Sequence, residues 1–359
     1  MITGNIGEWS EIYTLFKLLS DGQLTPGDEN IEKIKDLFYP IVKILRTESH
    51  GTFEYAIKDE IVITSSNKEE IRIPISTFKE KTSFLLEKIK ANKDTTFNVP
   101  EIEAFMAEIN CISLKANSTT KSDINIVIHD LRTNQQPLLG FSIKSQLGNP
   151  STLLNAGKTT NFVYKVEGVN WDDRAIDTIN AIDTKTKIKD RIQAVIEKGG
   201  RFNFIGTEQK IFFNNLTLID SALPKIIGEI VFAFNTEKRS TIKSLVEHIQ
   251  KANPLNYDVS NDHQFYNYKI KRFLTDVALG MMPSKVWSGA YDATGGYLIV
   301  KEDGEILCYH IYNKNEFENY LLNNTKLETA SSSRHDFGSL FKENGEVFFK
   351  LNLQIRFIK

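Results

Sequence analysis

Cysteine is scarce in this chain, and its scarcity excludes several classes of protein. Only two cysteines, Cys111 and Cys308, occur among 359 residues. They are too far apart for the closely spaced ligand pairs of a structural zinc module, and two cysteines cannot build the disulfide framework of a small secreted domain. We expect both to be structural thiols in a reducing cytoplasm.

Long apolar runs are also missing. No run approaches the roughly 18 residues that a membrane-spanning helix needs. The N-terminus carries Glu8 and Glu11 and lacks the basic segment that begins a secretory signal. Internal repeats and low-complexity tracts are absent as well, which argues against a solenoid or a linker. We therefore expect a cytoplasmic protein with no membrane partner.

Charge of one sign is not in excess. The formal net charge is −2, so the whole molecule exerts no attraction on nucleic acid, and any DNA contact must come from a local basic cleft. With 41% hydrophobic residues, the chain can bury a sizeable core and is long enough for one large or two ordinary domains.

The most informative feature that is present is a predicted hairpin near residues 121–146. Between residues 122 and 130, Ile124, Ile126 and Ile128 alternate with Asp123, Asn125, Val127 and His129, as in a strand with one clearly apolar face. A second strand-like run covers residues 138–145, and the turn formers of 132–137 lie between the two. Asp123 then points away from the isoleucine face.

Asp123 and Lys144 form a combination that metal-dependent phosphodiester hydrolysis can use. The carboxylate can hold a hard cation such as Mg²⁺, and the ammonium can orient or deprotonate the attacking water. This layout resembles that of the PD-(D/E)XK nucleases. The sequence departs from it at Ser142, which stands where an acidic residue is expected two positions before the lysine. Since Asp123 alone would leave a cation under-coordinated, another carboxylate must complete the site.

Glu8 is the first candidate for this carboxylate. It lies one turn before Ile12, in line with a predicted helical stripe of Ile12, Leu15, Phe16 and Leu19. An acid on such a stripe is costly to bury without a partner. The alternative is that Glu8 lies in a solvated first helical turn, where the helix dipole favours an acid. Glu108 is the next candidate, but it lies off the apolar face of its own predicted helix.

Further along the chain, the sequence resembles the HpaII-type family of type II restriction endonucleases. The resemblance rests on ordered segments that span almost the whole chain: residues 4–12, 140–148, 151–157, 159–162, 331–338 and 348–357. It implies recognition and cleavage of a short palindromic site in double-stranded DNA, which is CCGG in the family's namesake. It also implies Mg²⁺ as cofactor and a cognate DNA methyltransferase in the same system, and a palindromic site suits a homodimer.

The coarse pattern predicts an α/β or α+β fold. The resemblance adds a PD-(D/E)XK-like core, with a mixed sheet flanked by helices, and a C-terminal lobe. We place a nuclease domain at 1–235 and a lobe for DNA recognition at 236–359. The pattern also predicts a helix at 31–45 that is kinked or broken at Pro40, a helix or loop at 151–156, a short strand at 211–213 and a hairpin formed by 297–301 and 306–312.

Seven residues are candidates for DNA contact. Arginine is the usual bidentate reader of guanine, so Arg334 is the first choice for base recognition, with His335 and Lys342 beside it. The alternative is that the Ser/Arg/Asp-rich turn at residues 331–336 is an ordinary solvated loop that contacts no base. The small polar residues and the lysine after the second strand fit phosphate or backbone contacts; they are Asn155, Lys158, Thr159 and Asn161. Lys158 could equally be an ordinary surface lysine.

Two function classes remain open. The first is a Mg²⁺-dependent, sequence-specific endonuclease in which Asp123 binds metal, Lys144 acts on water and Glu8 completes the metal shell. The second is a non-catalytic DNA-binding or structural protein on a nuclease-like fold, which the serine at position 142 suggests.

Overall fold

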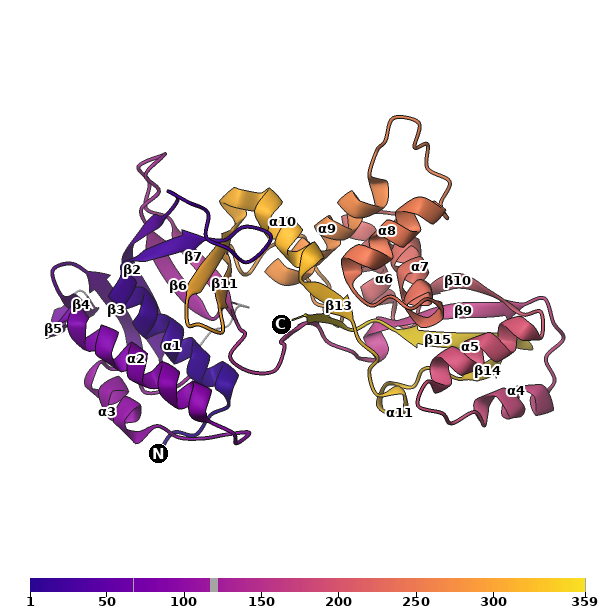
Figure 1. Ribbon diagram of the computed structural model, residues 1–359, viewed down its shortest axis with the longest axis horizontal. Helices are drawn as coiled ribbons and strands as arrows, with labels where there is room; N and C mark the ends of the chain where they lie inside the picture. The colour runs from indigo at the N-terminus through magenta and orange to yellow at the C-terminus, as the bar shows by residue number, and fades with distance from the viewer. Residues whose placement is uncertain (67, 117–121, 359) are drawn as a thin grey trace. The chain divides into compact units, whose positions relative to one another are not determined.

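The computed structural model describes residues 1–66, 68–116 and 122–358, and the chain divides into two compact units (Figure 1). The first unit contains residues 1–151 and 291–320, and the second contains residues 152–290 and 321–358. Among the described residues, no helix is both long enough and apolar enough to cross a membrane.

A mixed sheet forms the centre of the first unit. Its strand order, within the described residues, is β1-β12-β11-β7-β6-β2-β3-β4-β5. β11 runs parallel to β7 and β1 parallel to β12, and the other neighbours are antiparallel. The strands are β1 (Gln23–Pro26), β2 (Tyr39–Glu48), β3 (Gly51–Ile57), β4 (Ile61–Ser65), β5 (Lys68–Ile73), β6 (Ile124–Ile128), β7 (Leu138–Ser145), β11 (Gly296–Val300) and β12 (Ile306–His310).

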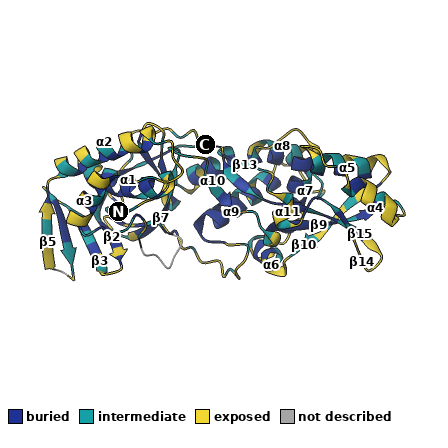
Figure 2. Ribbon diagram, turned by 90° about the horizontal axis from the view of Figure 1, so that it is seen from below, coloured by how far each residue is buried: buried dark blue, intermediate teal, exposed yellow. Residues whose placement is uncertain are grey.

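Among the described residues, this unit contains the helices α1 (Ile6–Asp21), α2 (Ile75–Ala91) and α3 (Pro100–Glu108), together with most of α10 (Lys314–Asn323). α1 lies against β2, β7 and α2. Its predicted apolar stripe is fully buried, and Phe16 meets the rings of Phe78 and Phe105 edge-on. Figure 2 shows the buried face of α1 and the exposed outer face of α2. Because this packing sets the rotation of α1 about its axis, it also determines which α1 side chains face β7.

The second unit contains two smaller sheets and most of the helices. The strands of one are ordered β10-β9-β15-β14 and those of the other β13-β16-β8. Their bounds are β8 (Thr152–Leu154), β9 (Asn161–Glu167), β10 (Arg201–Thr207), β13 (Thr325–Leu327), β14 (Leu340–Glu343), β15 (Glu346–Asn352) and β16 (Ile355–Phe357). The helices are α4 (Asp173–Asn180), α5 (Lys187–Glu197), α6 (Lys210–Ile219), α7 (Leu223–Thr236), α8 (Ile242–Ala252), α9 (Phe265–Leu279) and α11 (Ser332–His335). η1 (Lys158–Thr160) precedes β9. η2 (Ile311–Asn313) and α10 follow β12 in the first unit, and only the last turn of α10 belongs to the second unit.

Both predicted hairpins are confirmed, as is the mixed sheet flanked by helices. Three local predictions are wrong. Residues 31–38 are not helical and Tyr39–Glu48 is a strand, because Pro40 disfavours a helix interior and the following β-branched residues suit a sheet. Residues 211–213 lie inside α6, and residues 152–154 form β8, which pairs with β16. A strand this short is stabilised by its pairing with a distant segment, and that pairing produces no periodic pattern in the sequence around residues 152–154.

The structure also divides the chain differently from the predicted boundary between residues 235 and 236, which falls at the end of α7 within the second unit. β11 and β12 follow that boundary in sequence but belong to the first unit, where β11 pairs with β7. β9 precedes the boundary but pairs with β15 in the second unit. Pairings between distant strands decide the division, so a single cut in the linear sequence does not follow it.

Candidate active site

The β6–β7 hairpin fixes Asp123 beside β7. Antiparallel pairing places Ile124 opposite Phe141, and the Asp123 N–H donates to the Phe141 carbonyl at 2.8 Å. Two residues further along β7, the Ile143 N–H donates to Asp123 Oδ2 at 2.7 Å. Since a hydrogen bond from the backbone orients the carboxylate, Asp123 occupies a defined position next to the second strand. Lys121, at the edge of the predicted hairpin, lies outside the described residues.

Lys144 is held in an environment unusual for a lysine. Burial lowers its pKa, and the negative charges of Asp123 and Glu11 oppose that shift. Its Nζ lies 5.1 Å from the ring centroid of Tyr297 on β11. A lysine with a lowered pKa is more often neutral near pH 7, and only the neutral amine can accept a proton. Ser142, on the same strand, is only 2% exposed.

Glu11 is the acidic residue that sequence reasoning missed. It projects from α1 into a pocket of about 760 Å³ that is also lined by Glu8, Lys115 and Lys144. Burial, followed by the negative charge of Asp123, raises the pKa of Glu11 to about 8. Thus Asp123, Lys144 and Glu11 interact electrostatically, although Asp123 immediately precedes β6, Lys144 lies on β7 and Glu11 lies on α1.

A helical pattern in the sequence contains a signal for Glu11. It precedes Leu15 by four residues and Leu18 by seven, and both leucines are 1% exposed. Residues at this spacing share a helix face, so Glu11 faces inward as well as Glu8. The predicted stripe begins at Ile12, one residue after Glu11, so it aligns Glu8 with the apolar face and leaves Glu11 out.

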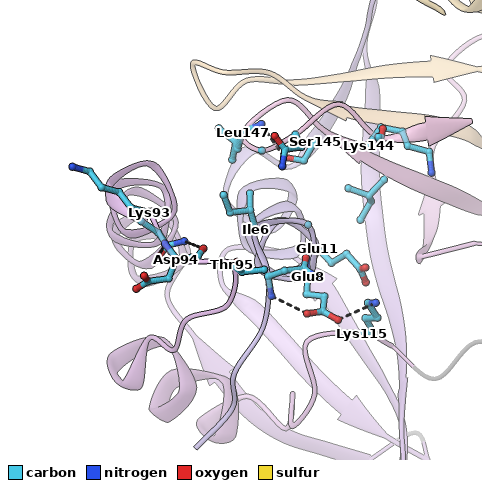
Figure 3. Close-up of a pocket in the computed structure, with 17 residues that line it drawn as sticks. Ile6, Glu8, Glu11, Lys93, Asp94, Thr95, Lys115, Lys144, Ser145 and Leu147 are labelled. Atoms are coloured by element: carbon cyan, nitrogen blue, oxygen red, sulfur yellow. Dashed lines mark hydrogen bonds and ion pairs between the residues drawn. The ribbon is translucent and has the colours of Figure 1, made fainter. Parts of the chain in front are cut away.

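Glu8 has local partners that account for its position. It closes a capping box, in which the Asn5 N–H donates to Glu8 Oε2 at 2.9 Å and the Glu8 N–H donates to Asn5 Oδ1 at 3.0 Å. Its other carboxylate oxygen lies 3.0 Å from Lys115 Nζ (Figure 3). The hydrogen bond from Asn5 is the main cause that lowers the pKa of Glu8. These contacts match the alternative of a helix-start acid, while a role for Glu8 as metal ligand stays a prediction.

The donor set around Lys144 fits a hard divalent cation. Among the residues that the structure describes, no three acidic, histidine or cysteine side chains are grouped closely enough to hold a metal by themselves. Mg²⁺ does not require such a cage, because it is commonly bound through one or two carboxylates and completed by water and substrate phosphate. Asp123 and Glu11 supply two such carboxylates, and the negative charge of Asp123 contributes to the raised pKa of Glu11.

The raised pKa of Glu11 predicts a pH-dependent penalty on folding in the absence of metal. The pKa rises from an ordinary 4.5 to about 8 in the folded chain, so the folded state holds this proton more tightly than the unfolded state. Stability should therefore fall as pH rises between those values. In EDTA, urea unfolding at pH about 5 and about 9 should show a larger loss of stability for the natural chain than for Glu11→Gln. Parallel pH profiles for the two proteins would contradict the burial assigned to Glu11.

The predicted base readers lie in the second unit. Arg334 and His335 belong to the short helix α11, where Arg334 is exposed and His335 partly buried. Lys342 on β14 donates to Asp173 Oδ1 at 2.5 Å. Because that ion pair joins two well-exposed side chains, it would cost little to exchange for a DNA phosphate.

The predicted backbone contacts separate into exposed and buried residues. Asn155 and Lys158 are exposed and Thr159 is partly buried. Lys158 Nζ lies 3.9 Å from Asp336 Oδ2. These three stay candidates for contact with DNA.

Asn161 has a different environment, since it is fully buried. Its Nδ2 donates to Glu208 Oε2 at 2.7 Å and to the His335 carbonyl at 2.8 Å. Its Oδ1 accepts from Asn352 Nδ2 at 2.7 Å. Asn161 thus ties the α11 turn to β9 and β15, a contact that supports the Arg334 segment and leaves the amide without an exposed face.

Comparisons with known proteins agree with the resemblance in the sequence. The family model described as HpaII restriction endonuclease matches residues 5–357. The Type II restriction enzyme HpaII of Haemophilus parainfluenzae is 50% identical over 359 residues, which cover 99% of each of the two chains. No solved structure matches this chain.

Proposed function

Since this chain belongs to the HpaII restriction endonuclease family, a family of type II restriction enzymes, we propose that it cuts double-stranded DNA at a short palindrome of the CCGG kind with Mg²⁺ as cofactor. The observation that carries this proposal is the Asp123 carboxylate held beside the strand of Lys144, in an environment that also raises the pKa of Glu11. We interpret the first unit as a PD-(D/E)XK-like nuclease core.

In this proposal Asp123 and Glu11 hold the cation, with Glu8 as the alternative second carboxylate. When bound, Mg²⁺ would supply Lewis-acid polarisation of a phosphoryl oxygen. Lys144 orients the attacking water or accepts its proton, and burial favours this by lowering the pKa of its ammonium. Ser142 is buried and uncharged, so its hydroxyl contributes little to the shell of a hard cation.

Digestion of plasmid DNA separates this function from that of a non-catalytic DNA-binding protein. Discrete fragments that form with Mg²⁺ and disappear with EDTA support the endonuclease. A salt-sensitive gel shift without cutting supports the binding protein. The termini of the fragments then give the recognition site and the cut position.

Partners follow from the proposed reaction. A palindromic site has two equivalent halves, so a homodimer would place one active site on each strand. A cognate methyltransferase in the same system would protect the host's own sites, with no direct contact required. Both proteins would work in the cytoplasm, where the host DNA lies.

Arg334→Ala should weaken discrimination for the cognate site. We propose that Arg334 in the second unit reads guanine, and a lost bidentate contact costs about 1–3 kcal/mol on the cognate duplex alone. Affinity for a scrambled duplex should change much less. Binding to both duplexes, measured at several salt concentrations, checks this. An equal loss on both, with a smaller salt slope, would identify Arg334 as a phosphate contact.

A further inference from the structure

The pocket around Lys144 presents an electrostatic problem to a DNA strand. Glu8 and Glu11 line it, and Asp123 lies close enough to raise the pKa of Glu11. A phosphodiester is itself an anion, so these carboxylates repel it unless cations lie nearby. Lys144 lines the same pocket, but its Nζ lies against the ring of Tyr297, 5.1 Å from the centroid, so a second cation is needed to offset several carboxylates.

Lys115 is the second cation in this environment. It follows α3 in the chain and lines the same pocket. Its Nζ lies 3.0 Å from Glu8 Oε1, and the hydrogen bond to Glu8 is the largest cause that raises the pKa of Lys115. The charges of Glu11 and Asp123 raise it further. Lys115 thus stays protonated and its field reaches all three carboxylates.

The contact between Lys115 and Glu8 is easy to exchange. The Lys115 side chain is 61% exposed, and ion pairs of this kind contribute only about 0–1 kcal/mol. Glu8 keeps its hydrogen bond from Asn5 when Lys115 leaves. A phosphodiester oxygen offers the ammonium the same kind of anionic acceptor as the carboxylate. Lys93, another lysine of the pocket lining, extends away from both glutamates (Figure 3).

We propose that Lys115 is a DNA contact at the active site, and that it exchanges Glu8 in the free protein for a backbone phosphate next to the reacting one in the complex. The inference rests on the proposed function and names a substrate contact for the same pocket. Lys115 offsets the repulsion between the carboxylates and the incoming strand, so its contribution belongs mainly to DNA binding.

Lys115→Gln tests this through the salt dependence of binding. The probe is a short synthetic duplex with one CCGG site, bound in Ca²⁺ so that binding is measured without turnover. Loss of one phosphate contact should lower the slope of log affinity against log salt by about one. The loss of affinity should be about tenfold at low salt. In Mg²⁺, KM should rise more than kcat falls.

Two further variants control for charge and for folding. Lys115→Arg keeps the cation and should restore most of the affinity and the slope. Lys90→Gln removes an exposed lysine from the last turn of α2, outside the pocket lining, and should leave both unchanged. An unchanged slope and KM for Lys115→Gln would overturn the inference and leave Lys115 as a partner of Glu8 only. If the natural chain neither binds nor cuts the duplex, the proposed function fails as well.

Discussion

Lys144→Ala and Asp123→Ala are each expected to abolish cleavage while DNA binding is largely retained. Asp123 is oriented by the Ile143 N–H at 2.7 Å, and Lys144 interacts with its charge in a desolvated environment. Removal of either group takes away stabilisation of the charge that develops on the phosphate, which costs on the order of a hundredfold or more. Single-turnover cleavage and a gel shift on the same duplex measure the two effects separately.

Lys43→Ala provides a matched control for these substitutions. Lys43 lies on the neighbouring strand β2 and pairs with Glu54 at 2.7 Å, and it is not part of the pocket lining. Its loss should leave cleavage close to normal. Normal cutting by Lys144→Ala or Asp123→Ala would refute the catalytic assignment.

Glu11→Gln is expected to raise the Mg²⁺ concentration needed for cleavage far more than Glu8→Gln or Ser142→Ala. Glu11 interacts directly with the charge of Asp123, whereas Glu8 closes the cap of α1 and pairs with Lys115. Loss of a carboxylate ligand should weaken metal affinity on the order of ten- to a hundredfold. A Mg²⁺ titration of cleavage by the three variants ranks them.

The order of the three variants in the Mg²⁺ titration identifies the second metal ligand. A larger effect of Glu8→Gln would assign the second carboxylate to Glu8, as the sequence first indicates. Gln also preserves the capping box at this position, so such an effect could not be attributed to a frayed helix. If all three titrations match that of the natural chain, neither glutamate is a metal ligand.

The local part of the site could be predicted from sequence because its pattern is local. The alternation of Ile124, Ile126 and Ile128 and the turn before Leu138 define a hairpin, and β6 and β7 form it with Asp123 beside β7. The helix that contains Glu8 and Glu11 is equally clear, since its apolar residues recur at helical spacing.

Contacts between distant segments explain what could not be predicted. Tyr297 reaches Lys144 only because β11 pairs in parallel with β7, a pairing across about half of the chain that leaves no periodic signal. In the sequence Asn161 is one polar residue among several, but in the folded chain it is buried and its side chain is hydrogen-bonded to Glu208 and the His335 carbonyl. The role proposed for Lys115 likewise depends on the partners that surround it in the folded chain.

Cleavage of a CCGG duplex by the natural chain and by Asp123→Asn, compared side by side in Mg²⁺, decides whether the protein is a metal-dependent endonuclease that uses Asp123. The natural chain should produce one defined pair of ends within the site, and EDTA should stop the reaction. Asp123→Asn should bind the same duplex and leave it intact. Equal cutting by both proteins, or binding without cutting by the natural chain in Mg²⁺, would contradict the account.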